Sequence, residues 1–319
     1  MNDPAATIID IEEQRKWLVE HKQALGLSWG DVFRKTGIPV GTVSQFGGNG
    51  YKGNELTVAE QVYRYRQTLV AQTQIAFELP EIPGYFQTET SRQLERLLQL
   101  GQRGRLVVAA MGAGLGKTIT ARNYASCFTN VFMATMSPST AGVNTMQIEM
   151  LEALGERDAA GTPQKLSRRI RARVANLGNP LLIIDEAQHL SEKALEEIRS
   201  WNDAVGVGIA LFGNESVWQR LTGGSRQANF AQMFSRVGLN IRRSLPLQGD
   251  VTAMADAWRI ADEPTIAYLR KIAMTPGGLR GATFALEIAS MIAAAEQRPL
   301  ALDDLQDAWT QLSSRPVLS

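Results

Sequence analysis

Hydrophobic and polar residues are arranged differently in the middle of the chain and at its two ends. From about residue 88 to residue 247, short apolar runs alternate with longer stretches in which apolar residues recur at helical spacing. This alternation is typical of a parallel sheet whose strands are connected by helices. The expected strands are Arg105–Ala110, Asn130–Ala134, Leu181–Asp185, Val207–Gly213 and Val237–Ile241.

The two ends of the chain predict helices only. Apolar residues recur at helical spacing in the C-terminal stretches, which begin with DVTAMADAWRI and end with LDDLQDAWTQL. Short helical patterns fill the N-terminal part, and the segment FELPEIPGYFQ that follows it contains Pro80 and Pro83, which disfavour regular structure. We therefore predict an N-terminal helical domain (1–70), a linker (71–87), an α/β core (88–247) and a C-terminal all-helical small domain (248–319).

Composition and charge indicate where the protein is located, but they say little about its activity. The 319 residues are 44% hydrophobic and 20% charged, which is ordinary for a soluble globular protein of two or three domains. No apolar run approaches the roughly 20 residues that span a bilayer, the acidic start MNDPAATIIDIEEQ does not resemble a signal peptide, and the single cysteine, Cys127, excludes an intramolecular disulfide. We expect a cytoplasmic protein without a membrane partner. Because the net charge is only +1, binding to DNA would require locally clustered positive charge.

The segment RLVVAA-MGAGLGKT-ITARNYAS combines a strand, a glycine-rich loop and a helix. This order places successive backbone N–H groups at a helix N-terminus, where they bind phosphate. Lys117 is expected to reach the β- and γ-phosphates of ATP, and the hydroxyl of Thr118 to ligate Mg²⁺. Met111 replaces the first glycine of the usual GxxxxGK[ST] pattern, and we expect Gly112 to form the turn in its place. The predicted nucleotide-binding residues are Gly112, Ala113, Gly114, Leu115, Gly116, Lys117 and Thr118.

The segment LLIIDEAQHL predicts a buried strand that ends in two acidic residues. Asp185, at the end of the strand, is expected to hold Mg²⁺ together with Thr118. Glu186 is placed to orient and activate the water that attacks ATP. His189, near a predicted helix start, is interpreted mainly as a capping group rather than a catalytic residue.

Three further residues are candidates for the hydrolysis reaction. Asn214 follows the strand in VGIALFGNES, where an amide could help to hold the attacking water. Arg236 precedes the last predicted strand, and Arg280 lies at the start of a C-terminal helix. An arginine can neutralise the transferring phosphoryl group, and an arginine supplied by a neighbouring subunit would make hydrolysis depend on assembly. A surface or interdomain salt bridge is the alternative for both arginines, and Arg242 and Arg243 compete with Arg236.

The N-terminal segment LSWGDVFRKTGIPVGTVSQF predicts a helix-turn-helix. The first helix is Trp29–Thr36, Gly37 supplies the turn and the second helix is Pro39–Phe46. The small core of this helix pair is expected to contain Val32, Phe33, Ile38 and Val43. Candidate DNA contacts are Thr42, Ser44 and Gln45 on the second helix and Lys52 after it. A helical module that binds protein, or that only packs, is the alternative.

A second basic feature lies within the α/β core, in QKLSRRIRAR. Its apolar residues recur at helical spacing, so Arg169 and Arg173 share one flank of a helix. Such a run is often only a solvated helix face, and the alternative is a surface that follows DNA phosphates. The candidate phosphate contacts are Lys165, Arg168, Arg169, Arg171 and Arg173.

Taken in order, these segments resemble the MuB family, the target-capture ATPases of Mu-type transposing phages. The resemblance rests on SWGDVFRKTGIPVGTVSQF, GNGYKGNEL, GAGLGKT, LLIIDEAQHL, LFGNES and SRVGLNIRRSLPL, and it extends over nearly the whole chain. It implies an AAA+ P-loop ATPase fold with Mg²⁺ and ATP, DNA-stimulated hydrolysis, and largely non-specific binding to double-stranded DNA. It also implies an ATP-bound homo-oligomer, as a ring or helical filament, that delivers target DNA to a transposase and stimulates strand transfer.

Two other functions fit the same segments. One is a transcription regulator in which ATP controls the helix-turn-helix, and binding to a single operator would favour it. The other is a loader ATPase of secretion or replication, in which the N-terminal module docks onto a protein.

Overall fold

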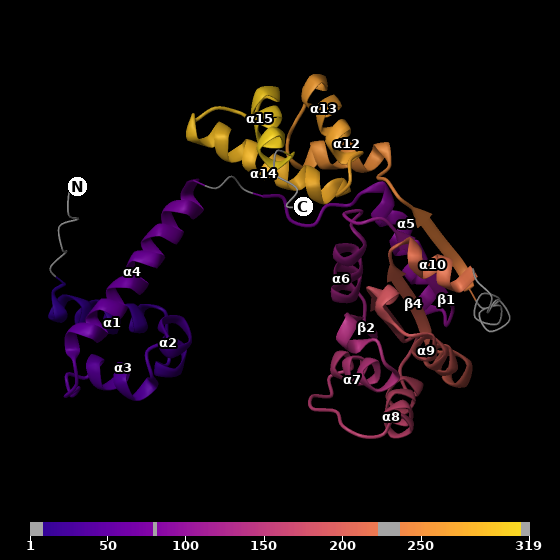
Figure 1. Cartoon of the computed structure of the whole chain (residues 1–319), viewed down its shortest axis with the longest axis horizontal. Helices are drawn as coiled ribbons and strands as arrows, with labels where there is room; N and C mark the ends of the chain where they lie inside the picture. The colour runs from indigo at the N-terminus through magenta and orange to yellow at the C-terminus, as the bar shows by residue number, and fades with distance from the viewer. Residues whose placement is uncertain (1–8, 79–81, 223–236, 314–319) are drawn as a thin grey trace, which may run out of the picture. The chain divides into compact units, whose positions relative to one another are not determined.

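A computed structural model of the chain describes residues 9–78, 82–222 and 237–313. The chain divides into two compact units, Met1–Pro80 and Glu81–Ser319. Among the described residues, the first unit has one hydrophobic core and the second has three. Figure 1 shows both units and labels most of their helices and strands.

The described part of the N-terminal unit is helical. The helices are α1 (Ile11–Ala24), α2 (Trp29–Thr36), α3 (Val40–Gly47) and α4 (Glu55–Glu78). Helix α2 begins at a capping box formed by Ser28 and Asp31 and ends at Gly37, whose φ of 74° lies in the left-handed region. The two predicted helices are therefore present, the second displaced by one residue. Helix α4 continues to Glu78, so the first part of the predicted linker is helical.

The core of the N-terminal unit corrects one expectation. Val32, Ile38 and Val43 are buried as predicted, but Phe33 is 43% exposed. Neighbouring residues on a helix point in different directions, so on α2 the side chain that follows the buried Val32 faces solvent. Phe46, which is fully buried, contributes to this core instead of Phe33.

The second unit contains a five-stranded parallel sheet with the strand order β2-β3-β4-β1-β5. All five predicted strands are present, and each end lies within two residues of its prediction. Because β4 lies between β3 and β1, the carboxyl ends of these three strands lie next to one another. The strands are β1 (Leu106–Met111), β2 (Val131–Thr135), β3 (Leu181–Asp185), β4 (Gly208–Gly213) and β5 (Val237–Arg243).

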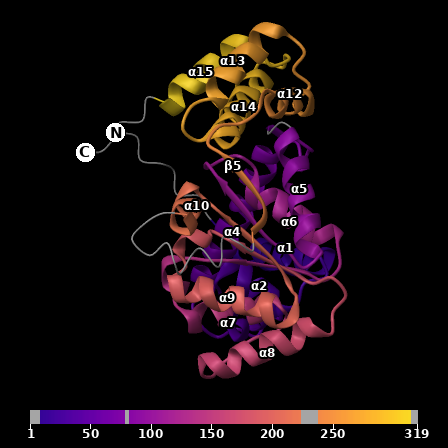
Figure 2. The same cartoon turned by 90° about the vertical axis from the view of Figure 1, so that its right-hand side faces the viewer.

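Helices cover both faces of the sheet. Helices α5 (Glu89–Gln102) and α6 (Lys117–Cys127) pack on one face. The other face is covered by α7 (Val143–Ala153), α8 (Pro163–Ala175) and α9 (Glu192–Val205), with α8 and α9 side by side (Figure 2). All residues of β1, β3 and β4 are buried, which explains why these strands are continuous apolar runs in the sequence.

The C-terminal part of the second unit is helical and has its own hydrophobic core. Its helices are α12 (Gln248–Ala257), α13 (Glu263–Ala273), α14 (Gly278–Ala295) and α15 (Leu302–Ser313), and they form one group in Figure 1. By length and composition alone, α14 is the one described helix that could cross a membrane, which is weak evidence because core helices pass the same test. Leu279, Leu286 and other α14 residues are buried in the helical core.

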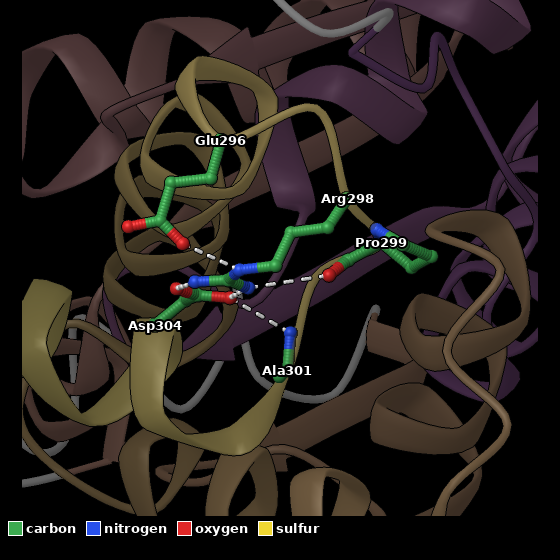
Figure 3. A network of polar contacts seen from close by, with 5 residues as sticks. All are labelled: Glu296, Arg298, Pro299, Ala301 and Asp304. Atoms are coloured by element: carbon green, nitrogen blue, oxygen red, sulfur yellow. Dashed lines mark hydrogen bonds and ion pairs between the residues drawn. The ribbon is translucent and has the colours of Figure 1, made fainter.

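An ion pair between the exposed Arg298 and the buried Asp304 holds the connection between α14 and α15 (Figure 3). Arg298 donates two hydrogen bonds of 2.6 Å to the carboxylate of Asp304 and a third of 2.6 Å to Glu296. Asp304 also accepts the backbone N–H of Ala301 at 2.9 Å, and its side chain is 3% exposed. Arg298 holds the pKa of the Asp304 carboxyl below its usual value, and the carboxylate in turn raises the pKa of Arg298.

Candidate functional site

The glycine-rich loop connects β1 to α6, as predicted. Gly114 and Gly116 have φ values of 74° and 80°, so the turn lies at these two residues. The expectation that Gly112 forms the turn is wrong. Gly112 instead permits a close approach of the chain after β5, because an added Cβ would lie 2.5 Å from the carbonyl oxygen of Ser244. Met111 is the buried last residue of β1, which explains why a large side chain fits there.

Lys117, the first residue of α6, is 9% exposed. Its Nζ donates to the carbonyl oxygens of Met111 and Gly112 at 2.7 and 2.6 Å. Burial lowers the pKa of Lys117, the carboxylates of Glu186 and Asp185 raise it, and Arg280 lowers it further. Lys117, Glu186 and Arg280 line one cleft at the start of α6.

The end of β3 meets the start of α6. The hydroxyl of Thr118 donates to Oδ2 of Asp185 at 2.7 Å, and Asp185 is 1% exposed. The other oxygen of Asp185 accepts the backbone N–H of Glu186 at 3.0 Å. Glu186 is half-buried, has a φ of 54° and lines the cleft beside Lys117. The structure therefore brings Thr118, Asp185 and Glu186 to one location.

Asn214 directly follows β4 and is exposed. Its side-chain oxygen accepts from the backbone N–H and the hydroxyl of Ser216, at 3.0 and 2.6 Å, at the start of α10 (Glu215–Thr222). Its backbone N–H donates to the side chain of Gln188 at 3.3 Å. Asn214 thus lies at the end of a strand that neighbours both β1 and β3, as expected.

A cleft of about 450 Å³ connects the glycine-rich loop to the C-terminal helices. A Cβ on Gly114 would lie only 1.8 Å from the carbonyl oxygen of Gly277, so the loop packs directly against the start of α14. This contact brings Arg280 into the lining of the cleft, although its side chain remains exposed. An apolar part of the lining, made by Tyr85, Phe86, Met254, Leu279 and Phe284, was not predicted from the sequence.

Comparison with known proteins identifies the family of this chain. Residues 100–221 match the family model of an AAA domain, and residues 235–312 match that of the C-terminal part of the Mu B transposition protein. The ATP-dependent target DNA activator B of Escherichia phage Mu is 33% identical over 306 residues, which cover 96% of each chain.

The chain belongs to the MuB family.

Two other relatives agree with this assignment to the MuB family. The ATP-dependent target DNA activator B of Escherichia phage D108 is also 33% identical over 306 residues, again 96% of each chain. The Mu-like prophage FluMu DNA transposition protein B of Haemophilus influenzae is 32% identical over 266 residues, which cover 82% of this chain and 91% of that protein. The AAA match includes the glycine-rich loop, Asp185, Glu186 and Asn214.

Among the candidate arginines of this MuB-family chain, Arg236 lies outside the described residues. Arg243 donates to Thr90 and Gln93 of α5, at 2.8 and 3.0 Å, and therefore has a structural role. Arg242 is exposed and lies over the ring of Trp218, with its guanidinium carbon 5.2 Å from the ring centroid. Of the two competitors considered for Arg236, only Arg242 is exposed.

The predicted basic helix is α8, and its cations differ in their partners. Lys165 and Arg168 are exposed, whereas Arg171 is half-buried. Arg169 and Arg173 both form ion pairs with Glu156, which lies before the helix. They are on one flank, as expected, but the same acidic residue partly neutralises both. The sequence run contains no acidic residue, so this neutralisation was not predicted.

The predicted DNA contacts in the N-terminal unit are not equally accessible. Gln45 and Lys52 are exposed. Thr42 and Ser44 are half-buried, and the hydroxyl of Ser44 donates to the carbonyl of Gly41 at 3.2 Å. The helix pair therefore offers fewer free polar groups than its sequence indicates.

Proposed function

We propose that this chain is an ATP-dependent target DNA activator of a Mu-like transposition system. The observation that supports this most strongly is the similarity to activator B of phage Mu over 96% of both chains. The Haemophilus influenzae relative is named a DNA transposition protein, and residues 235–312 match the model of the Mu B transposition protein, which favours this function over a transcription regulator or a loader ATPase. In this proposal the chain acts in the cytoplasm, assembles on double-stranded DNA as a homo-oligomer, and delivers that DNA to a transposase.

The cleft supports ATP as the nucleotide. The backbone N–H groups from Gly112 to Thr118 and the ammonium group of Lys117 bind the phosphates. The base occupies the apolar part of the cleft, near Tyr85, Leu279 and Phe284. Arg280 adds a second cation near Lys117, so the site favours a polyanionic ligand.

The residues at the end of β3 fit a magnesium ion. Thr118 and Asp185 place a hydroxyl and a carboxylate oxygen 2.7 Å apart, and Mg²⁺ prefers oxygen ligands of this kind. In the described parts of the chain, no group of three His, Cys, Asp or Glu side chains could hold a metal by itself. Phosphate and water oxygens would supply the remaining ligands, and bound Mg²⁺ would neutralise charge on the phosphates.

Hydrolysis requires a base near the terminal phosphate. Glu186 lines the cleft beside Lys117 and can accept a proton from the attacking water. Lys117 and Arg280 oppose the negative charge that develops on the transferring phosphoryl group. We further propose that Arg236 of a neighbouring subunit completes this charge neutralisation, so that assembly on DNA stimulates hydrolysis.

The decisive test compares Glu186→Gln with wild type. The variant should bind ATP normally but hydrolyse it about 100-fold or more slowly, because the amide cannot act as a base. ATP-dependent assemblies on linear duplex DNA, seen by electron microscopy, should then persist longer than those of wild type. Glu152→Gln, at an exposed position on α7, is the matched control. Turnover of Glu186→Gln at the wild-type rate would exclude Glu186 as the base.

A further inference from the structure

The side chain of Gln188 connects two functional strand ends. Gln188 lies in η2 (Ala187–His189), the short helical turn after β3. Its Nε2 donates to Oε2 of Glu186, and its Oε1 accepts the backbone N–H of Asn214 at 3.3 Å. One amide therefore joins the candidate base at the end of β3 to the residue that follows β4.

The backbone around Glu186 is also constrained. Glu186 has φ 54° and ψ 37°, a left-handed conformation that few residues other than glycine adopt. Such a conformation persists only where the surrounding contacts hold it. Here the Glu186 N–H donates to Asp185 at 3.0 Å, and the Glu186 carbonyl accepts the N–H of His189 at 3.0 Å. Gln188 adds the contact that holds the carboxylate itself.

The position of the Gln188 amide depends on the end of β4. A Cβ on Gly213 would lie 2.5 Å from Oε1 of Gln188 and 2.5 Å from a methyl group of Val217. Both distances are shorter than van der Waals contact, so any larger residue at position 213 would displace one of these side chains. The absence of a side chain at Gly213 leaves the space in which the amide bridges the two strands.

We propose that Gln188 is a positioning residue for ATP hydrolysis, whose amide fixes the Glu186 carboxylate relative to the backbone of Asn214. This inference rests on the proposed function, in which Glu186 is the base. A carboxylate accepts through both of its oxygens. The N–H of Gln188 restrains Oε2, which leaves Oε1 to accept from the attacking water. A base held in one orientation avoids the loss in rate that follows from a misplacement of about 1 Å.

The test uses Gln188→Met, which keeps the length of the side chain but can neither donate to Glu186 nor accept strongly from Asn214. We expect kcat to fall about 100-fold, while KM for ATP and the affinity for ATP change less than about twofold. Gln188→Ala, which removes the amide without adding bulk, should give the same result. His189→Ala is the matched control on the same turn, because its ring makes no hydrogen bond or ion pair to any described residue.

A double-mutant cycle separates positioning from a general structural effect. If Gln188 acts through Glu186, adding Gln188→Met to Glu186→Gln should slow single-turnover hydrolysis by less than about twofold further. An equal fall in both backgrounds, or wild-type kcat in either folded Gln188 variant, would overturn the inference. Wild-type turnover in Glu186→Gln would instead contradict the proposed function. The two failures are therefore distinguishable.

Discussion

The glycine-rich loop and helix α8 both gather positive charge, but the surroundings of those charges differ. Lys117 is 9% exposed, and backbone carbonyls hold it at the point where two strands end. Arg169 and Arg173 are 40% and 45% exposed, and both pair with Glu156. Exposed ion pairs of this kind contribute little stability, but they reduce the charge available to a second anion. The density of basic residues in a sequence therefore overstates the free charge of a surface.

The largest effect that tests this comparison is expected at the loop. Lys117→Ala removes the buried cation at the start of α6, so ATP affinity should fall about 100-fold or more and turnover should be lost. Nucleotide binding can be measured by calorimetry or with a fluorescent analogue. Lys193→Ala, at an exposed position on α9, is the control and should bind ATP as wild type does. Retained ATP binding in Lys117→Ala would contradict the assignment of the loop.

An intermediate effect is expected on α8, where the cations that pair with Glu156 can be compared with those that form no ion pair with a described residue. If this helix contacts DNA phosphates, Lys165→Ala with Arg168→Ala should lower the slope of log affinity against log salt by about two per protomer. Arg169→Ala with Arg173→Ala should lower the slope by less, because Glu156 already neutralises part of their charge.

The measurement on α8 is a salt titration on unrelated duplexes with ATP present, since backbone contacts carry little sequence information. Glu156→Gln should increase the affinity of the otherwise wild-type chain. Unchanged slopes in both double variants would show that α8 is only a solvated face and that DNA binds elsewhere.

The smallest effect concerns stability, and it compares the ion pairs of α8 with that of Arg298, because the arginines are similarly exposed but Asp304 is 3% exposed and Glu156 is 20% exposed. Arg298→Ala leaves the buried carboxylate of Asp304 without its main partner, so the midpoint of thermal unfolding should fall by about 5 °C at pH 7. Arg169→Ala, whose partner Glu156 is 20% exposed, should change it by about 1 °C or less.

The effect at Arg298 should depend on pH in a defined direction. The pKa of Asp304 is lowered in the folded chain, so its stabilising contribution is present above the unfolded pKa of about 4 and is lost as pH falls through the folded pKa. The difference in midpoint between wild type and Arg298→Ala should therefore shrink as pH falls from 5 to 3. A constant difference would show that the variant acts through packing rather than through the ion pair.

The sequence by itself determined the strands, most of the helices and the nucleotide-binding segment. Strands buried on both faces are continuous apolar runs, and helices carry apolar residues at a fixed spacing, so both are visible in short windows. The glycine-rich loop and the pair Asp185–Glu186 were predictable for the same reason. Each is a contiguous segment whose chemistry depends on its own backbone and on the strand end where it lies.

Only the tertiary structure decided which distant residues meet. It placed Arg280 at the loop through the contact of Gly114 with Gly277, paired Arg169 and Arg173 with Glu156, and left Phe33 exposed while Phe46 filled the core. It also brought the amide of Gln188 between Glu186 and Asn214. The energies of hydrogen bonds and steric contacts change when the distance between two atoms changes by a few tenths of an ångström. The spacing of residues along a chain does not fix distances of that size between separate elements, because the packing of those elements sets them.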